Sequence, residues 1–227
     1  MSNRLEQLFQ KSSFKKIENN QFFCEEKQMS LKEMLEMIKN HKYFDIFKEE
    51  MTSIDLEKIY KSETHGISHN ERVAIFIMAI CVLEEYTEDE VRIALNGAKY
   101  HDIGRVNDYE DDTHGLRSSE LLDKINLNLS AEDKEILKCA CIGHSIDDEF
   151  YDEIITDIKD SKKAVRALQT LKDADALDRV RLEFDGLNPN YLRTKSSKKL
   201  IAAAYELYEN YYLIKELENE QRNYQRN

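Results

Sequence analysis

The chain has 227 residues, of which 33 are Lys or Arg and 45 are Asp or Glu, so its formal net charge is −12. It contains only six Gly and one Pro, roughly a quarter of ordinary usage, whereas antiparallel β architectures need such turn residues every few positions. Because 34% charged residues beside 41% hydrophobic ones is typical of amphipathic helices, the composition argues against a β sandwich or barrel and predicts an all-α protein.

The acidic balance also limits the partners that we expect. Duplex nucleic acid and anionic membranes attract clustered Lys and Arg, and the two short basic clusters, at 11–16 and 193–199, are better explained as solvated helix ends. The longest apolar run, at 73–83, is shorter than the roughly 18 residues that a membrane span needs. With no apolar signal-peptide core at the N-terminus and no disulfide framework among the Cys, we expect a cytoplasmic protein that binds neither membrane nor polymeric nucleic acid.

The first strong helix signals lie in the N-terminal third of the chain. The capping box Ser30-x-x-Glu33 predicts a helix start within 1–60, which we interpret as an N-terminal helical extension of a single helical domain over 61–227. A second capping box, Ser68-x-x-Glu71, predicts the start of a helix that is apolar almost all round from 73 to 83. Such a helix is expected at the centre of a bundle.

Further helix signals follow at short intervals, separated by a loop around 107–112, and give a bundle of about seven or more helices. The expected helices begin at Thr87-x-x-Glu90 and at Ser130-x-x-Asp133, span 118–125 and 162–182, and run from 197 onward.

The last expected helix carries four tyrosines and an apolar stripe with spacings of three and four residues. The tyrosines favour helix packing over a base-stacking platform, because stacking needs accompanying positive charge. The stripe could also form the seam of a homodimer. The tyrosines are Tyr205, Tyr208, Tyr211 and Tyr212.

Several ionisable residues continue the apolar stripes instead of opposing them. At 100° per residue Asp102 lies about 20° from Val91, with His101 beside it. His144 and Asp175 likewise fall on the apolar faces of their expected helices. A buried carboxylate costs several kcal/mol unless it is paired or bound to a metal, so His and Asp residues that converge from different helices indicate a metal site.

The motifs around these residues resemble the HD superfamily of metal-dependent phosphohydrolases, in the branch with extra histidines. The elements occur in the family's order over 65–179, and the resemblance implies an HD-type helical bundle without indicating the substrate. The five elements are HGISHNERV at 65–73, HDIGR at 101–105, His114-Gly115-x-x-Ser118, Gly143-His144-Ser145, and LKDADALD at 171–178.

The resemblance also implies a set of metal ligands. In this family the first His, the HD pair and the late Asp hold one divalent cation, and the extra His residues hold a second. Mixed His and carboxylate ligation suits Mn, Fe, Co, Ni or Zn better than Mg or Ca. The implied ligands are His69, His101, Asp102 and Asp175 for the first ion, and His114 and His144 for the second, with Asp102 bridging.

Some alternatives stay open at this stage. Ser145 stands where this branch often has a second His, so both one and two ions are possible. The family's Ala-Asp-x-Leu pattern selects Asp175; Asp173 would then lie beside the ligands, and Asp178 could orient a ligand His or bind Arg179. His114 could instead be a surface histidine after an acidic loop.

The resemblance implies hydrolysis of a phosphomonoester or phosphodiester of a small substrate, a nucleotide or a cyclic (oligo)nucleotide being favoured. Bound metals would lower the pKa of water from 15.7 toward about 7, which makes hydroxide available to attack phosphorus. We expect Asp102 and Arg105 to be catalytic, and Arg72, Arg179 and Arg193 to bind the phosphate by bidentate hydrogen bonds.

Two other functions fit the same sequence. One is a non-catalytic HD-fold sensor that binds metal and nucleotide without turnover, although the complete ligand set argues against it. The other is a single-strand nuclease, against which the charge of −12 and the lack of a basic track count.

Overall fold

The computed structural model describes residues 1–15, 26–182 and 186–224, and within these ranges it contains eleven α-helices and no β-strand. The prediction of an all-α protein is therefore confirmed; Lys16, the last residue of the first basic cluster, lies outside the described residues. The helices are α1 (Asn3–Gln10), α2 (Leu31–Lys39), α3 (Phe44–Thr52), α4 (Ile67–Leu83), α5 (Glu88–Tyr100), α6 (His114–Leu121), α7 (Ala131–His144), α8 (Tyr151–Ile155), α9 (Ser161–Leu177), α10 (Lys195–Lys198) and α11 (Ile201–Tyr224). Four 3₁₀ turns join them, η1 (Leu122–Lys124), η2 (Asp148–Phe150), η3 (Asp178–Arg181) and η4 (Pro189–Tyr191).

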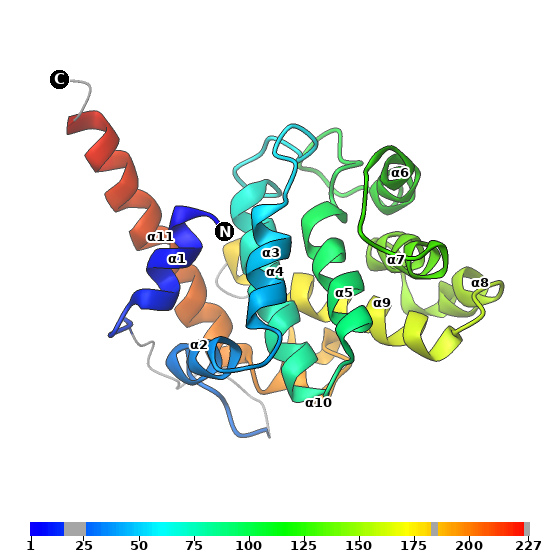
Figure 1. The fold of residues 1–227 in the computed structure, drawn as a ribbon, viewed down its shortest axis with the longest axis horizontal. Helices are drawn as coiled ribbons and strands as arrows, with labels where there is room; N and C mark the ends of the chain where they lie inside the picture. The colour runs from blue at the N-terminus through cyan, green and yellow to red at the C-terminus, as the bar shows by residue number, and fades with distance from the viewer. Residues whose placement is uncertain (16–25, 183–185, 225–227) are drawn as a thin grey trace.

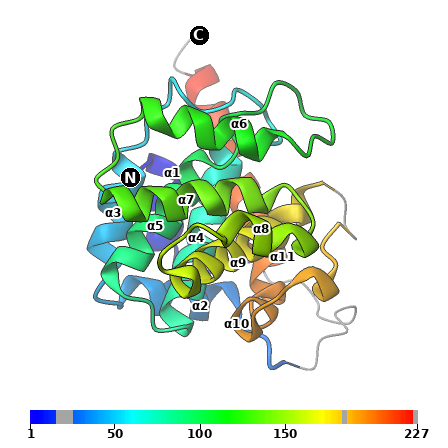
Figure 2. The same ribbon diagram turned by 90° about the vertical axis from the view of Figure 1, so that its right-hand side faces the viewer.

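Helices α4 and α5 form the middle of the bundle (Figure 1), with α1, α2 and α11 on one side and α6 to α9 on the other. From Val73 to Ile80 α4 is apolar on every face, and each residue of this stretch is fully buried. It packs against α5, α9 and α2. Figure 2 shows α6, α7 and α9 in successive layers, in agreement with the contacts of α7 with both neighbours. A helix without a polar face needs such cover on all sides.

The predicted N-caps hold in three cases. The hydroxyls of Ser30 and Thr87 accept hydrogen bonds from the backbone N–H groups of Glu33 and Glu90. The carboxylates of these two residues accept from the backbone N–H groups of Ser30 and Thr87, so both capping boxes are confirmed. Ser130 caps α7 through the backbone N–H of Asp133, at 3.1 Å. Each of these caps depends only on contacts within one helical turn, so the sequence alone predicts it.

Other helix boundaries differ from the predictions. α4 begins at Ile67 with Gly66 as its N-cap, not at Ser68, whose hydroxyl instead accepts from Arg4 of α1 at 2.8 Å. α6 begins at His114, four residues earlier than predicted, and α9 ends at Leu177, where the chain tightens into η3. Helices α1, α3 and α8 had no sequence signal that we recognised.

The apolar stripe of α11 packs inside the single chain. The helix contacts α1, α2 and η3. The side chains that form the stripe between Leu200 and Ile214 are each at most 5% exposed. The spacing of the stripe is thus explained without a second copy of the chain. None of the described helices combines the length and the apolar composition that a membrane span requires.

Candidate metal centre

The six implied ligands come together in one cluster from five places in the bundle. α4 supplies His69, the C-terminal end of α5 and the turn after it supply His101 and Asp102, and α6, α7 and α9 supply one residue each. Five of the six are at most 8% exposed, and the Asp175 side chain is 27% exposed. Because His114 is 5% exposed, the alternative of a surface histidine is wrong.

Asp102 lies at the centre of the cluster, between two pairs of histidines. Its Oδ2 is 3.7 Å from Nε2 of His69 and 3.6 Å from Nε2 of His101. Its Oδ1 is 3.1 Å from Nε2 of His114 and 3.6 Å from Nε2 of His144. Each carboxylate oxygen therefore faces a separate pair of ring nitrogens.

Two overlapping groups of side chains have the spacing of ion ligands. His69, His101 and Asp175 offer one atom each within 4.8 Å of one another, and Oδ1 of Asp175 is 3.3 Å from Nε2 of His69. His101, Asp102 and His144 form the second group. Because His101 belongs to both groups and its Nε2 can bind only one ion, the two groups are alternative positions for an ion.

Every ring in the cluster is oriented through its other nitrogen. Each Nδ1 lies against an oxygen that accepts hydrogen bonds, so Nδ1 carries a proton and Nε2 is the nitrogen that faces the cluster. The acceptors are Asp178 Oδ2 for His69 (2.7 Å), the Gly97 carbonyl for His101 (3.1 Å), the Asp111 carbonyl for His114, and the Cys141 carbonyl for His144 (2.5 Å).

The Nε2 atoms of two histidine pairs face each other at short range, and their separations show whether a cation fits between them. The Nε2 atoms of His69 and His101 are 3.1 Å apart, and those of His114 and His144 are 2.9 Å apart. Two buried lone pairs at this distance repel each other unless a proton or a cation lies beside them. The separations suit adjacent ligands on one ion bound at about 2.1 Å, and imidazole with carboxylate is a donor set for transition metals.

The charges around the cluster also suit a cation. Burial lowers the pKa of His101 to about 3, so the ring is neutral at pH 7, as a metal ligand must be. Burial alone would raise the pKa of Asp178, but Arg72 and the hydrogen bond from His69 outweigh it and hold the pKa at about 2. Asp178 is therefore an ionised acceptor that fixes the tautomer of His69.

Two of the proposed arginines line a cavity of about 420 Å³ that opens onto the cluster. His114, His144 and Asp175 form part of its wall. Arg105 donates from Nε to Oδ1 of Asp102 at 2.8 Å, and Arg179 lies on the rim, where its Nε donates to the Gly186 carbonyl. Arg105 and Arg179 are thus placed where a ligand of the cluster would contact them.

The other two proposed arginines lie elsewhere. Arg72 donates from Nε and Nη2 to Asp178 at 2.6 and 2.9 Å, so its guanidinium lies behind His69 and not in the cavity. Arg193 pairs with Asp148 at 2.7 Å and with Asp173 at 3.3 Å, near the start of α10. Asp173, which we expected beside the ligands, binds the backbone of this same segment.

Sequence reasoning missed one cation next to the cluster. Arg181 lies in η3, where its Nε donates to the Thr64 carbonyl at 3.0 Å. Its Nη1 is 3.9 Å from Oδ1 of Asp175 and 3.6 Å from Oδ2 of Asp178, and it finds no hydrogen-bond partner among the described residues. Arg181 lies beyond the last motif, inside a helix predicted to run to 182, so no signal placed it here.

Ser145, which stands in place of a second histidine, lines the cavity that opens onto the cluster and also holds a neighbouring loop. Its hydroxyl donates to the Asp112 carbonyl at 2.9 Å and so ties the acidic loop before α6 to the end of α7.

A scan against protein-family models found none that matches the chain, and searches of curated proteins and of solved structures found no match either. The helical fold and its buried His and Asp cluster are compatible with an HD-like protein. They define an all-α protein with a cluster that can hold a metal ion.

Proposed function

We propose that the protein is an HD-type, metal-dependent phosphohydrolase that cleaves a phosphate ester of a small substrate. The substrate class that we favour is a nucleotide. The observation that carries the proposal is Asp102, with each carboxylate oxygen facing a pair of oriented imidazoles. The order of the five sequence motifs supports the same class.

The polar residues of the cavity have distinct parts in this reaction. A bound divalent ion would supply a Lewis acid and activate water at neutral pH. The water oxygen forms a bond to phosphorus, the ester P–O bond breaks, and the leaving oxygen takes up a proton. Arg105 and Arg179 can donate hydrogen bonds to the phosphoryl oxygens, whose charge grows in the transition state.

The charge of the cavity makes the metal necessary for binding as well. Five carboxylates line it, against two arginines. A phosphate would be repelled by this surplus unless cations neutralise it. We therefore infer that phosphate esters bind only after the cluster is loaded with metal.

The test is hydrolysis of an aryl phosphate and an aryl phosphodiester by protein that has been stripped with EDTA and reloaded with Mn²⁺. We expect activity with Mn²⁺ and at least a roughly 100-fold loss in Asp102→Ala, because the variant lacks the residue between both histidine pairs. Asp123→Ala is the matched control, since Asp123 is an exposed carboxylate paired with Lys138.

Two measurements separate the alternatives. Absence of hydrolysis of every phosphate ester by metal-loaded protein would contradict the proposal, and tight nucleotide binding without turnover would favour a sensor. Elemental analysis of the loaded protein gives the number of ions: two would favour a diesterase, and one would favour a nucleotidase.

A further inference from the structure

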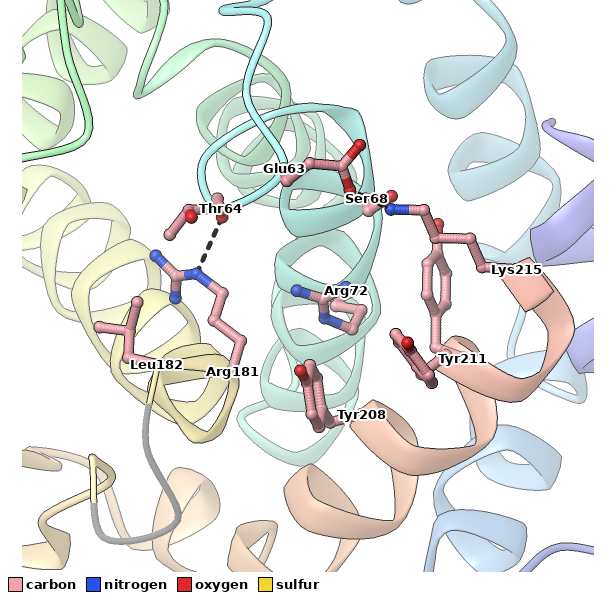
Figure 3. Close-up of a pocket in the computed structure, with 10 residues that line it drawn as sticks. Glu63, Thr64, Ser68, Arg72, Arg181, Leu182, Tyr208, Tyr211 and Lys215 are labelled. Atoms are coloured by element: carbon pink, nitrogen blue, oxygen red, sulfur yellow. Dashed lines mark hydrogen bonds and ion pairs between the residues drawn. The ribbon is translucent and has the colours of Figure 1, made fainter. Parts of the chain in front are cut away.

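A second cavity, of about 310 Å³, lies between α4, η3 and α11. Figure 3 shows Arg72 at its centre with Tyr208 below it, Arg181 and Leu182 on one side, and Tyr211 on the other. We call it the tyrosine–arginine cavity. The chemistry of the metal cluster uses none of its aromatic residues.

The tyrosines of α11 meet positive charge here that the sequence did not show beside them. The guanidinium of Arg72 lies 5.5 Å from the centre of the Tyr208 ring and 5.2 Å from that of Tyr211. Arg181 lines the same cavity from η3. Aromatic rings combined with guanidinium groups are what proteins use to stack the flat faces of nucleic-acid bases. The objection that these tyrosines lack accompanying charge is therefore removed by the fold.

Not all of the ring surface is covered by the protein. Tyr208 is half-buried and Tyr212, which also lines the cavity, is 52% exposed. Leu182 adds an apolar wall that is 41% exposed. Glu63 and Lys215, which both line the cavity, form an ion pair, so the charge of this carboxylate is offset.

The tyrosine–arginine cavity adjoins the metal cluster. Leu182 lines both this cavity and the one that opens onto the cluster, and the neighbours Thr64 and His65 line one cavity each. Arg181 lies between them, with Nη1 3.9 Å from Oδ1 of Asp175. A metal ion on Asp175 would take up the charge of that carboxylate and leave the field of Arg181 to attract an anion.

We propose that the tyrosine–arginine cavity binds the aromatic base of a nucleotide whose phosphate reaches the metal cluster past Arg181. The inference rests on the proposed function for the position of the phosphate. It makes the protein select nucleotides over phosphates of plain sugars, because a sugar has no flat ring to stack on Tyr208 or Tyr212.

Calorimetric titration of the protein in EDTA tests the base site apart from catalysis. The probes are adenosine, cytidine and ribose, which share the ribose, differ in the base, and carry no phosphate for the carboxylates of the neighbouring cavity to repel in the absence of metal. We expect adenosine or cytidine to bind about tenfold more tightly than ribose, as one stacked base would provide. Tyr208→Leu and Tyr212→Ala should each remove most of that difference, while Tyr191→Ala, an exposed tyrosine outside both cavities, should not.

Thermal unfolding of each variant shows whether it is folded. If Tyr208→Leu does not fold, Tyr212→Ala, which changes an exposed position, still tests the inference. Equal binding of the three probes, no saturable binding of either nucleoside, or wild-type selectivity in Tyr212→Ala would overturn the inference. Selective binding without turnover by Mn²⁺-loaded protein would leave the inference standing and contradict the hydrolase. Turnover of phosphate esters without preference for a base would support the hydrolase and contradict the base site.

Discussion

Asp173 on α9 and Asp178 just after it are close in sequence, but their carboxylates contact different parts of the structure. Asp178 contacts His69 and Arg72, both of them buried, and so joins a proposed ligand to a cation. Asp173 is equally buried but accepts from the backbone of Arg193 and Thr194. The two residues allow the effect of a carboxylate on the metal cluster to be separated from its effect on stability.

Asp178→Asn is expected to weaken Mn²⁺ binding by about 10- to 100-fold, because the neutral amide holds His69 less firmly and lowers the basicity of its Nε2. It should also destabilise the fold by about 1–3 kcal/mol, since Arg72 loses its buried counter-ion. Metal titration followed by calorimetry, together with urea unfolding, measures both quantities.

Asp173→Asn is the matched control. We expect a comparable loss of stability with unchanged Mn²⁺ affinity, because the hydrogen bonds of Asp173 go to the segment before α10 and to Ser197. Equal losses of metal affinity in the two variants would show that Asp178 acts only through general stability.

At the scale of elements, the helices around the cluster meet backbone to backbone. A Cβ on Gly104 would lie 2.4 Å from the His114 carbonyl, and one on Gly115 would lie 2.2 Å from the Cys141 carbonyl. These glycines let the turn after α5 approach α6, and let α6 approach α7. The close packing is what brings His114 within 2.9 Å of His144.

Gly115→Ala should therefore destabilise the protein by about 1–3 kcal/mol and weaken metal binding, because the added methyl group forces α6 away from α7. Gly97→Ala, within α5, is expected to have the opposite effect on stability. Its Cβ would lie 3.4 Å from the flexible side chain of Leu171, which is an ordinary contact. Alanine in the middle of a helix should stabilise by about 0.5–1 kcal/mol. Urea unfolding of both variants checks the signs, and destabilisation of similar size in the two would contradict this account.

The same close approaches explain which elements the sequence could predict. The N-caps Ser30 and Thr87 act within one helical turn, so their motifs sufficed. The start of α4 depends on tertiary geometry that no cap motif shows. A Cβ on Gly66 would lie 2.2 Å from the Ser62 carbonyl, and Ser68 is engaged by Arg4, which is distant in sequence. The ligand residues were visible as motifs, whereas Arg181 came to the cluster only because η3 turns it there.

At the scale of the whole molecule, the metal cluster joins parts of the chain that are distant in sequence. His69 and Asp175 are separated by more than one hundred positions, yet their side-chain atoms lie 3.3 Å apart. The ligands come from α4, the end of α5, α6, α7 and α9, and an unfolded chain would not hold them at these distances. A metal that binds this arrangement therefore stabilises the entire bundle.

Mn²⁺ at about 100 times its dissociation constant should stabilise the folded state by about 2.7 kcal/mol, which for a chain of this size raises Tm by about 5–10 °C. Differential scanning calorimetry in EDTA and in Mn²⁺ measures the shift. Asp102→Ala should lose most of it, because its carboxylate faces all four imidazoles, whereas Asp123→Ala should keep it. Mg²⁺ should produce a smaller shift, since the donor set is rich in nitrogen. A full Mn²⁺ shift in Asp102→Ala would mean that the ion binds elsewhere on this acidic protein, and the metal centre would then have to be sought outside the histidine cluster.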